Sequence, residues 1–200
     1  MGDLSRGAGP LSNRRGVIAG AAVLALWPRA AAARRGFAID WQGAAPDPAV
    51  AAFLEGQVRL VEALPVSGAA MDFFRGQVIH VDRERGTRTR AVPAIHFARV
   101  VQPADNPVLL HELVHRWQVE RMRGPRDPRV VALWEAAKAS GDWPAQSYML
   151  SNPFEFFAMC ASVVLYGRAA RPPFTRVAVK ATLPAVYALV VEEFGARGLA

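Results

Sequence analysis

The spacing of apolar residues predicts a first amphipathic helix between Asp47 and Pro65. Apolar residues recur there every three or four positions, which places them on one face of an α-helix. They are Val50, Phe53, Leu54, Val58, Val61 and Leu64. Asp47 is a suitable N-cap and Pro48 a suitable first helical residue, whereas Pro65 and Gly68 end the pattern. Residues 34–46 show no such period, so we expect them to be irregular.

Two short segments rich in branched residues, 77–81 and 92–97, are typical of β-strands. They flank the polar stretch 82–90, so we expect a hairpin with a long loop. Four arginines fall in that loop, at positions 83, 85, 88 and 90. A basic patch for an acidic partner is one interpretation of them, but a solvated loop is the favoured one.

A capping residue followed by proline marks the start of three further helices. The pairs are Asn106-Pro107, Asp127-Pro128 and Asn152-Pro153. Together with a last helix, the predicted segments cover residues 107–123, 127–140, 153–166 and 183–194. A helix, a small β region and then several helices indicate a mainly helical α+β domain, with a small β-sheet or hairpin before the second helix.

Composition indicates a globular protein with one main domain. The chain has 200 residues, of which 52% are hydrophobic and 20% charged, so a packed core can form. Cys160 is the single cysteine, which excludes an intramolecular disulfide. It lies in an apolar run, and we expect it to be a small buried residue.

The net charge of +7 does not require a nucleic-acid partner. The first 33 residues contain four arginines and one aspartate, so +3 of that charge lies there and +4 in the remainder. This is a modest excess for a nucleic-acid-binding domain. The chain also lacks the alternation of basic and aromatic residues that such surfaces use.

The N-terminal residues 1–33 are predicted to be an export signal and not part of the fold. Residues 13–18, Asn-Arg-Arg-Gly-Val-Ile, resemble a twin-arginine signal. The apolar stretch 16–27 is short for a membrane span, and three alanines at 31–33 offer a cleavage site. We therefore expect a mature domain at 34–200, periplasmic or extracellular, with no stable membrane span after signal removal. An uncleaved N-terminal anchor is the alternative.

The segment from His111 to His115 reads His-Glu-Leu-Val-His and predicts a metal site. Residues four apart on a helix share one face, so the two imidazoles can bind one ion. Neutral imidazole is a good zinc ligand. Glu112 is offset from the two histidines and can act as a general base toward a zinc-bound water without binding the metal itself.

A catalytic zinc usually has three protein ligands and one open position, so a third ligand is needed. Metzincins would place a histidine at position 121, which is arginine here, so that family is excluded. His80 and His96 fall in the predicted hairpin and are better interpreted as ordinary strand histidines. Glu155 remains the best candidate, although Asn152 and Glu155 also fit a capping box at the start of a helix.

The stretch from Tyr148 to Ala158 reads Tyr-Met-Leu-Ser-Asn-Pro-Phe-Glu-Phe-Phe-Ala. Together with the preceding His-Glu-x-x-His motif, it resembles the catalytic domain of anthrax lethal factor and its bacterial relatives, which are zinc metallopeptidases of the gluzincin kind. The resemblance covers residues 75–196. It implies a zincin-like fold, one Zn²⁺ ion and Glu155 as the third zinc ligand. It also implies that Tyr148 stabilises the oxyanion, since a phenol can donate a hydrogen bond to the developing charge.

Met159 departs from this family, because many relatives have an acidic residue at that place. A methionine cannot hydrogen-bond a ligating histidine, so support for the ligands has to come from elsewhere. Asp105 and Asn106 are candidate substitutes. This departure bears on turnover more than on zinc binding.

Two functions follow from these observations. The first is an exported zinc-dependent metalloendopeptidase, in which a zinc-bound water attacks the peptide bond with Glu112 as general base. The alternative is a catalytically weak or inactive zinc-binding protein that interacts with a partner in the cell envelope. Glu112 argues against the alternative, because a structural zinc site needs no base beside the metal. The implied partner is a peptide or protein substrate and no nucleic acid; the sequence carries no signal for the oligomeric state.

Overall fold

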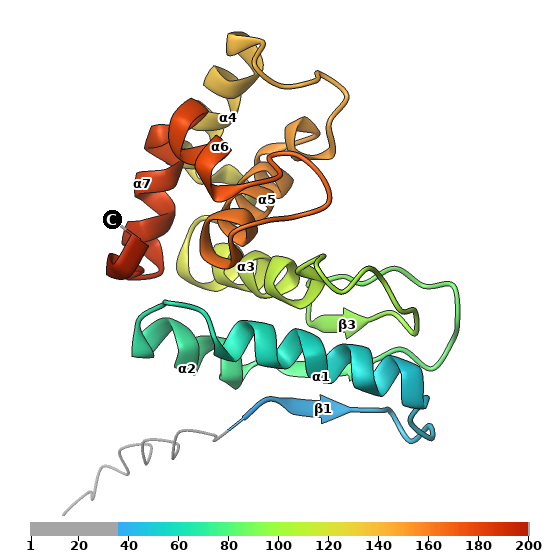
Figure 1. Cartoon of the computed structure of the whole chain (residues 1–200). Helices are drawn as coiled ribbons and strands as arrows, with labels where there is room; N and C mark the ends of the chain where they lie inside the picture. The colour runs from blue at the N-terminus through green and yellow to red at the C-terminus, as the bar shows by residue number, and fades with distance from the viewer. Residues whose placement is uncertain (1–35, 200) are drawn as a thin grey trace, which may run out of the picture. The chain divides into compact units, whose positions relative to one another are not determined.

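The computed structural model describes residues 36–199 and has the predicted class (Figure 1). Within these residues, seven α-helices accompany one three-stranded sheet, so the mainly helical α+β prediction is confirmed. The export signal predicted for residues 1–33 lies outside the described residues and stays a prediction. Among residues 36–199, no helix combines the length and the apolar character that crossing a membrane requires.

The sheet is parallel, so the predicted hairpin is wrong. Its strands are β1 (Ala38–Asp40), β2 (Val78–Val81) and β3 (Ile95–Phe97), in the order β1-β2-β3. The connection 82–94 is long enough for a crossover, which parallel neighbours need. The chain reverses its direction only after Arg90, which pairs antiparallel with His96 through backbone hydrogen bonds of 3.0 and 2.8 Å. The expectation of irregular structure at 34–46 was also wrong, since it misses β1.

One face of the sheet is apolar and buried, and the other carries paired ionisable groups. Ile79, Val81, Ile95 and Phe97 are buried in the core. On the opposite face the two strand histidines each contact a carboxylate. The Nδ1 atom of His80 lies 2.9 Å from Asp40 Oδ2, and that of His96 lies 3.1 Å from Asp82 Oδ1. These histidines support the sheet surface, in keeping with their interpretation as ordinary strand residues.

The helices predicted from capping residues all form, and two short helices were missed. The seven helices are α1 (Pro48–Glu62), α2 (Gly68–Gly76), α3 (Val108–Arg121), α4 (Pro128–Ser140), α5 (Pro153–Tyr166), α6 (Arg176–Thr182) and α7 (Pro184–Glu193). The missed ones are α2 and α6. Ser67 and Thr175 cap them, each accepting a 3.2 Å hydrogen bond from a backbone N–H. Helices this short depend on packing more than on local sequence, which explains why periodicity did not find them.

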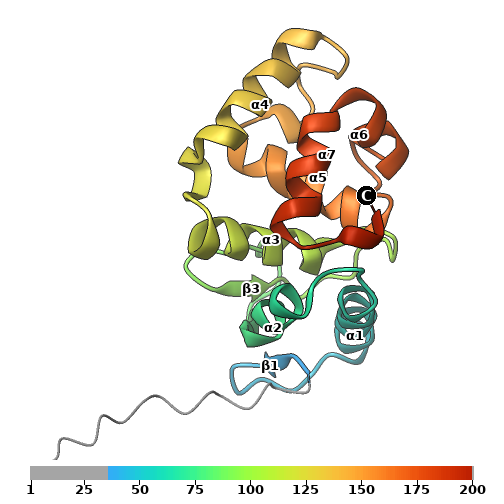
Figure 2. The ribbon, with the colours of Figure 1, turned by 90° about the vertical axis from the view of Figure 1, so that its left-hand side faces the viewer.

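Helix α3 lies at the centre of the described fold. Figures 1 and 2 show α1, α2 and the sheet on one side of it and α4 to α7 on the other. Its residues Leu109, Leu110, Leu113 and Val114 are fully buried, and α3 packs directly on α5. Helix α5 is itself almost wholly buried and includes Cys160, whose thiol pKa is raised by that burial. The prediction of a buried cysteine is confirmed.

The start of α3 is capped from another helix, and the predicted Asn106 cap is wrong. Asn106 uses its side chain to donate to Gln102 Oε1 at 2.8 Å, and the N-cap position is taken by Pro107. The buried side chain of Gln57, on α1, takes over the capping role expected of Asn106. Its Oε1 accepts from Leu109 N at 3.1 Å, and its Nε2 donates to the Asn106 carbonyl at 3.0 Å. A single glutamine therefore joins α1 to the helix that carries the histidines.

Replacing this glutamine should weaken the fold. Gln57→Leu leaves a buried N–H and a partly buried carbonyl without their partner, so we expect the free energy of unfolding to fall by about 2 kcal/mol. Urea denaturation in the presence of a chelator measures this without a contribution from bound metal. Glu55→Leu, at a solvent-exposed position of the same helix, is the control and should change stability by less than about 0.5 kcal/mol. Equal effects of the two variants would contradict the role assigned to Gln57.

Candidate metal centre

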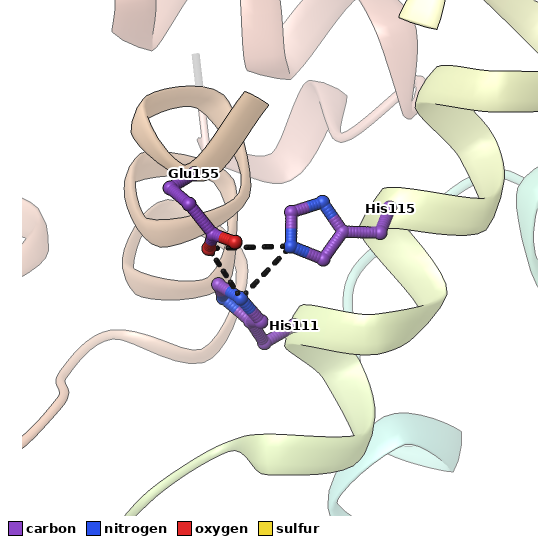
Figure 3. A group of neighbouring side chains, drawn as sticks. All are labelled: His111, His115 and Glu155. Carbon is purple, nitrogen blue, oxygen red and sulfur yellow. Dashed lines mark hydrogen bonds and ion pairs between the residues drawn. The ribbon is translucent and has the colours of Figure 1, made fainter. Parts of the chain in front are cut away.

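Helix α3 presents His111 and His115 side by side toward α5 (Figure 3). The four-residue spacing places both imidazoles on one face of the helix. Their Nε2 atoms lie 3.0 Å apart, and the side chains are 15% and 5% exposed. Helix α3 packs directly on α5, which brings this face next to α5.

Helix α5 supplies Glu155 to the same point. Asn152 caps the helix, with Oδ1 accepting a 2.9 Å hydrogen bond from the backbone N–H of Glu155. The Glu155 carboxylate instead faces α3, with Oε2 at 3.0 Å from His111 Nε2 and 3.3 Å from His115 Nε2 (Figure 3). Both interpretations of this segment therefore hold in part: Asn152 is the cap, and the Glu155 side chain joins the two histidines.

The three facing atoms lie within about 0.4 Å of the spacing that tetrahedral coordination of one ion gives. Bonds of about 2.0–2.1 Å at tetrahedral angles separate neighbouring ligand atoms by about 3.3–3.4 Å. The two histidine nitrogens and the Glu155 oxygen are separated by 3.0, 3.0 and 3.3 Å. Two imidazoles and one carboxylate are also a ligand set of catalytic zinc sites. This group could hold one metal ion.

The pattern of protons at the centre also favours a cation. The Nε2 atoms of His111 and His115 face each other at 3.0 Å, and both face Glu155 Oε2, at 3.0 and 3.3 Å. One proton on His111 Nε2 can satisfy only one of these contacts. A metal ion would satisfy all three atoms at once.

The ionisation states suit metal binding. Burial lowers the pKa of His111, which keeps this imidazole neutral at pH 7. Burial would raise the pKa of Glu155, but hydrogen bonds to His111 and His115 outweigh it and hold that pKa well below its usual range. Metal ligands must be deprotonated, and His111 and Glu155 meet this requirement at neutral pH.

Two residues outside the triad hold His115 in place. Gln118 is fully buried and contacts Nδ1, while Phe154 stacks on the imidazole with ring centroids 4.0 Å apart. The sequence reasoning missed Gln118 and named Asp105 and Asn106 instead. A glutamine three residues after the second histidine shares its helical face, and this spacing was the available signal. Asn106 bonds to Gln102 and supports neither histidine.

Glu112 faces a cleft of about 610 Å³ that runs beside the histidines. Its side chain is buried, and burial, helped by the negative charge of Glu155, raises the pKa of Glu112 to about 7. The positive charge of a protonated His115 works in the opposite direction. A carboxylate poised near neutral pH can both accept and return a proton, as general acid–base catalysis requires.

Tyr148 lies on the rim of the same cleft, in the short 3₁₀ helix Tyr148–Leu150. It is 45% exposed and its ring centroid is 6.5 Å from that of His111, so it is not a core aromatic. Burial of part of the side chain and the charge of Glu155 raise the pKa of Tyr148 to about 12. The hydroxyl therefore stays protonated at neutral pH and is available as a hydrogen-bond donor.

A second hollow, of about 730 Å³, lies between α1 and residues 165–176 and carries no comparable chemistry. Its lining is mostly apolar and contains neither of the two motif histidines. The smaller cleft is therefore the candidate site, because His111, Glu112 and Tyr148 all line it.

Comparison of the chain with protein-family models, with curated proteins and with solved structures gives no match. The interpretation of the site therefore rests on its own geometry.

Removing the outer support of His115 should weaken metal binding. Gln118→Leu eliminates the acceptor for Nδ1–H, so we expect zinc affinity to fall about 10- to 100-fold, as is usual for such partners. Competition with a chromophoric chelator measures this affinity. Gln118→Glu retains an acceptor oxygen and should bind zinc at least as tightly as the wild type. If Gln118→Leu kept the wild-type affinity, the contact to Nδ1 would have no part in metal binding.

Proposed function

We propose that this chain is a zinc-dependent peptidase whose metal ligands are His111, His115 and Glu155. The single observation that carries the proposal is the convergence of three ligand atoms at 3.0–3.3 Å beside a buried glutamate and a cleft. A structural zinc site would need neither the glutamate nor the cleft. Zinc sites of that kind are also usually closed by four ligands, often cysteines, whereas Cys160 is buried elsewhere in α5.

When bound, zinc would polarise the scissile carbonyl and lower the pKa of a water molecule toward neutrality. Glu112 accepts the proton of that attacking water and returns it to the leaving amine. Its pKa of about 7 suits both steps, and a nearby cation would shift the balance toward the basic form. Tyr148 donates a hydrogen bond from the cleft rim to the oxyanion.

The proposed family and location follow from sequence. The motif pair resembles the catalytic domain of anthrax lethal factor and its relatives, and the central histidine helix with a glutamate from a following helix supports a gluzincin-like arrangement. Residues 1–33 are proposed to direct the protein out of the cytoplasm by the twin-arginine route. The substrate would then be a peptide or protein encountered in the periplasm or outside the cell.

Metal content tests the ligand set. Purified wild-type protein should carry about one zinc per chain, because two imidazoles and a carboxylate complete the protein part of a catalytic site. Glu155→Gln and His115→Ala should each lose most of it, as measured by inductively coupled plasma mass spectrometry after dialysis. His96→Ala is the matched control, because His96 belongs to the sheet and pairs with Asp82, so it should retain full zinc.

Two outcomes would contradict this assignment. If Glu155→Gln kept the full zinc content, Glu155 would belong only to the start of its helix. The two histidines would then have no identified third ligand. A wild-type protein that takes up no zinc on titration would remove the basis for a peptidase altogether.

Replacing the proposed base should separate zinc binding from catalysis. Glu112→Gln removes proton transfer but none of the ligands, so zinc content should stay at the wild-type level. We expect the rate of peptide cleavage to fall by about 10²- to 10⁴-fold, the usual contribution of a general base. Cleavage of an unstructured protein such as casein, followed by mass spectrometry of the fragments, measures the rate.

The result with wild-type protein decides between the two candidate functions. Cleavage by the wild type that is lost in Glu112→Gln supports the peptidase. A wild type that holds zinc but cleaves nothing would favour the alternative, a zinc-binding protein of the cell envelope. Met159 favours that alternative to a degree, since it lines the cleft where many relatives have an acidic residue.

A further inference from the structure

Two arginines from distant parts of the chain line the cleft beside the candidate metal centre. Arg88 belongs to the connection between β2 and β3, and Arg171 to the connection between α5 and α6. Both side chains are exposed. Among residues 36–199, neither forms an ion pair with a carboxylate.

Six of the other fourteen arginines in residues 36–199 pair with a carboxylate. Arg75, Arg90, Arg116 and Arg129 pair with Glu62, Asp82, Glu120 and Asp127 respectively. Even the exposed Arg85, in the same connection as Arg88, pairs with Asp47. What distinguishes Arg88 and Arg171 is their place in the cleft lining, where their unpaired charges can act on a ligand.

The remainder of the cleft offers little negative charge to oppose them. Apart from the two arginines, its ionisable lining residues are His111, Glu112 and Tyr148, and the rest are uncharged, among them Val100, Val108 and Met159. The two guanidinium groups of the lining therefore outnumber its one carboxylate.

We propose that this cleft selects peptides with an acidic side chain near the bond held at the metal centre, and that Arg88 and Arg171 bind that carboxylate. Guanidinium binds carboxylate through two parallel hydrogen bonds, which gives geometric selectivity as well as charge attraction. The proposal rests on the proposed function for the position of the scissile bond, but it does not depend on turnover. For Arg88, one of the four arginines in the 82–90 loop, the proposal favours the interpretation as a basic patch for an acidic partner.

The test is peptide binding to the full-length protein, measured by fluorescence anisotropy. The probes are three labelled octapeptides, blocked at both ends, that differ only in a central residue, which is glutamate, glutamine or lysine. The protein carries Glu112→Gln so that no peptide is cleaved, and each titration is run with zinc and again after chelation. Arg88→Gln and Arg171→Gln are compared with the control Arg83→Gln, an exposed arginine of the same loop that lies outside the cleft.

We expect the glutamate peptide to bind about fivefold more tightly than the glutamine peptide, and the lysine peptide to bind most weakly. This preference should fall in Arg88→Gln and in Arg171→Gln, stay unchanged in Arg83→Gln, and fade in 0.5 M NaCl, at which exposed charges are strongly screened. Such a result supports the proposal even if the wild type cleaves nothing, in which case only the peptidase assignment fails.

Three results would overturn the proposal. Equal binding of the glutamate and glutamine peptides would show that the cleft does not recognise the carboxylate. A glutamate preference that survives both cleft substitutions, or that is lost equally in Arg83→Gln, would place recognition elsewhere. Absence of binding by all three peptides, with zinc content at one per chain, would refute peptide selection by this cleft while leaving the metal site intact.

Discussion

The contact between helices α3 and α5 is the constraint on which the rest of this structure depends. It brings an ionised carboxylate against two imidazole nitrogens at side chains that are only 5–18% exposed. Burying such a charge is costly unless a positive partner compensates it. A proton shared among the three groups compensates only one contact, whereas a divalent cation compensates all of them. The packing that stabilises the core thus also assembles a group that could hold one metal ion.

The same burial gives two neighbouring glutamates opposite properties. Glu155 faces the histidines and has a lowered pKa, while Glu112 faces the cleft without such partners and has a pKa raised to about 7. Carboxylates separated in this way typically divide binding and proton transfer between them. The fold, more than the residue type, therefore distinguishes Glu155 on α5 from Glu112 on α3.

Precision at the centre comes from residues that never touch the candidate ion. Gln118 and Phe154 fix the orientation of His115, and Gln57 joins the start of α3 to α1. These contacts span up to 52 positions along the chain. They take the place of the local cap and of the acidic partner expected at Met159. Support of this kind limits how far the imidazoles can rotate, which is what a three-ligand site needs.

By itself, the sequence determined the elements whose signals are local. The four-residue spacing of His111 and His115 dictates a shared helical face, and proline after a capping residue marks the starts of α1, α4 and α5. Tertiary structure decided whatever depends on distant partners. Strand direction follows from the path of the 82–94 connection, the short helices α2 and α6 depend on packing, and the Gln57 cap crosses between helices. The direction of the Glu155 side chain also depends on a distant partner. In sequence, a glutamate of a capping box and a glutamate that binds a metal look alike, and only the packing of α3 against α5 distinguishes them.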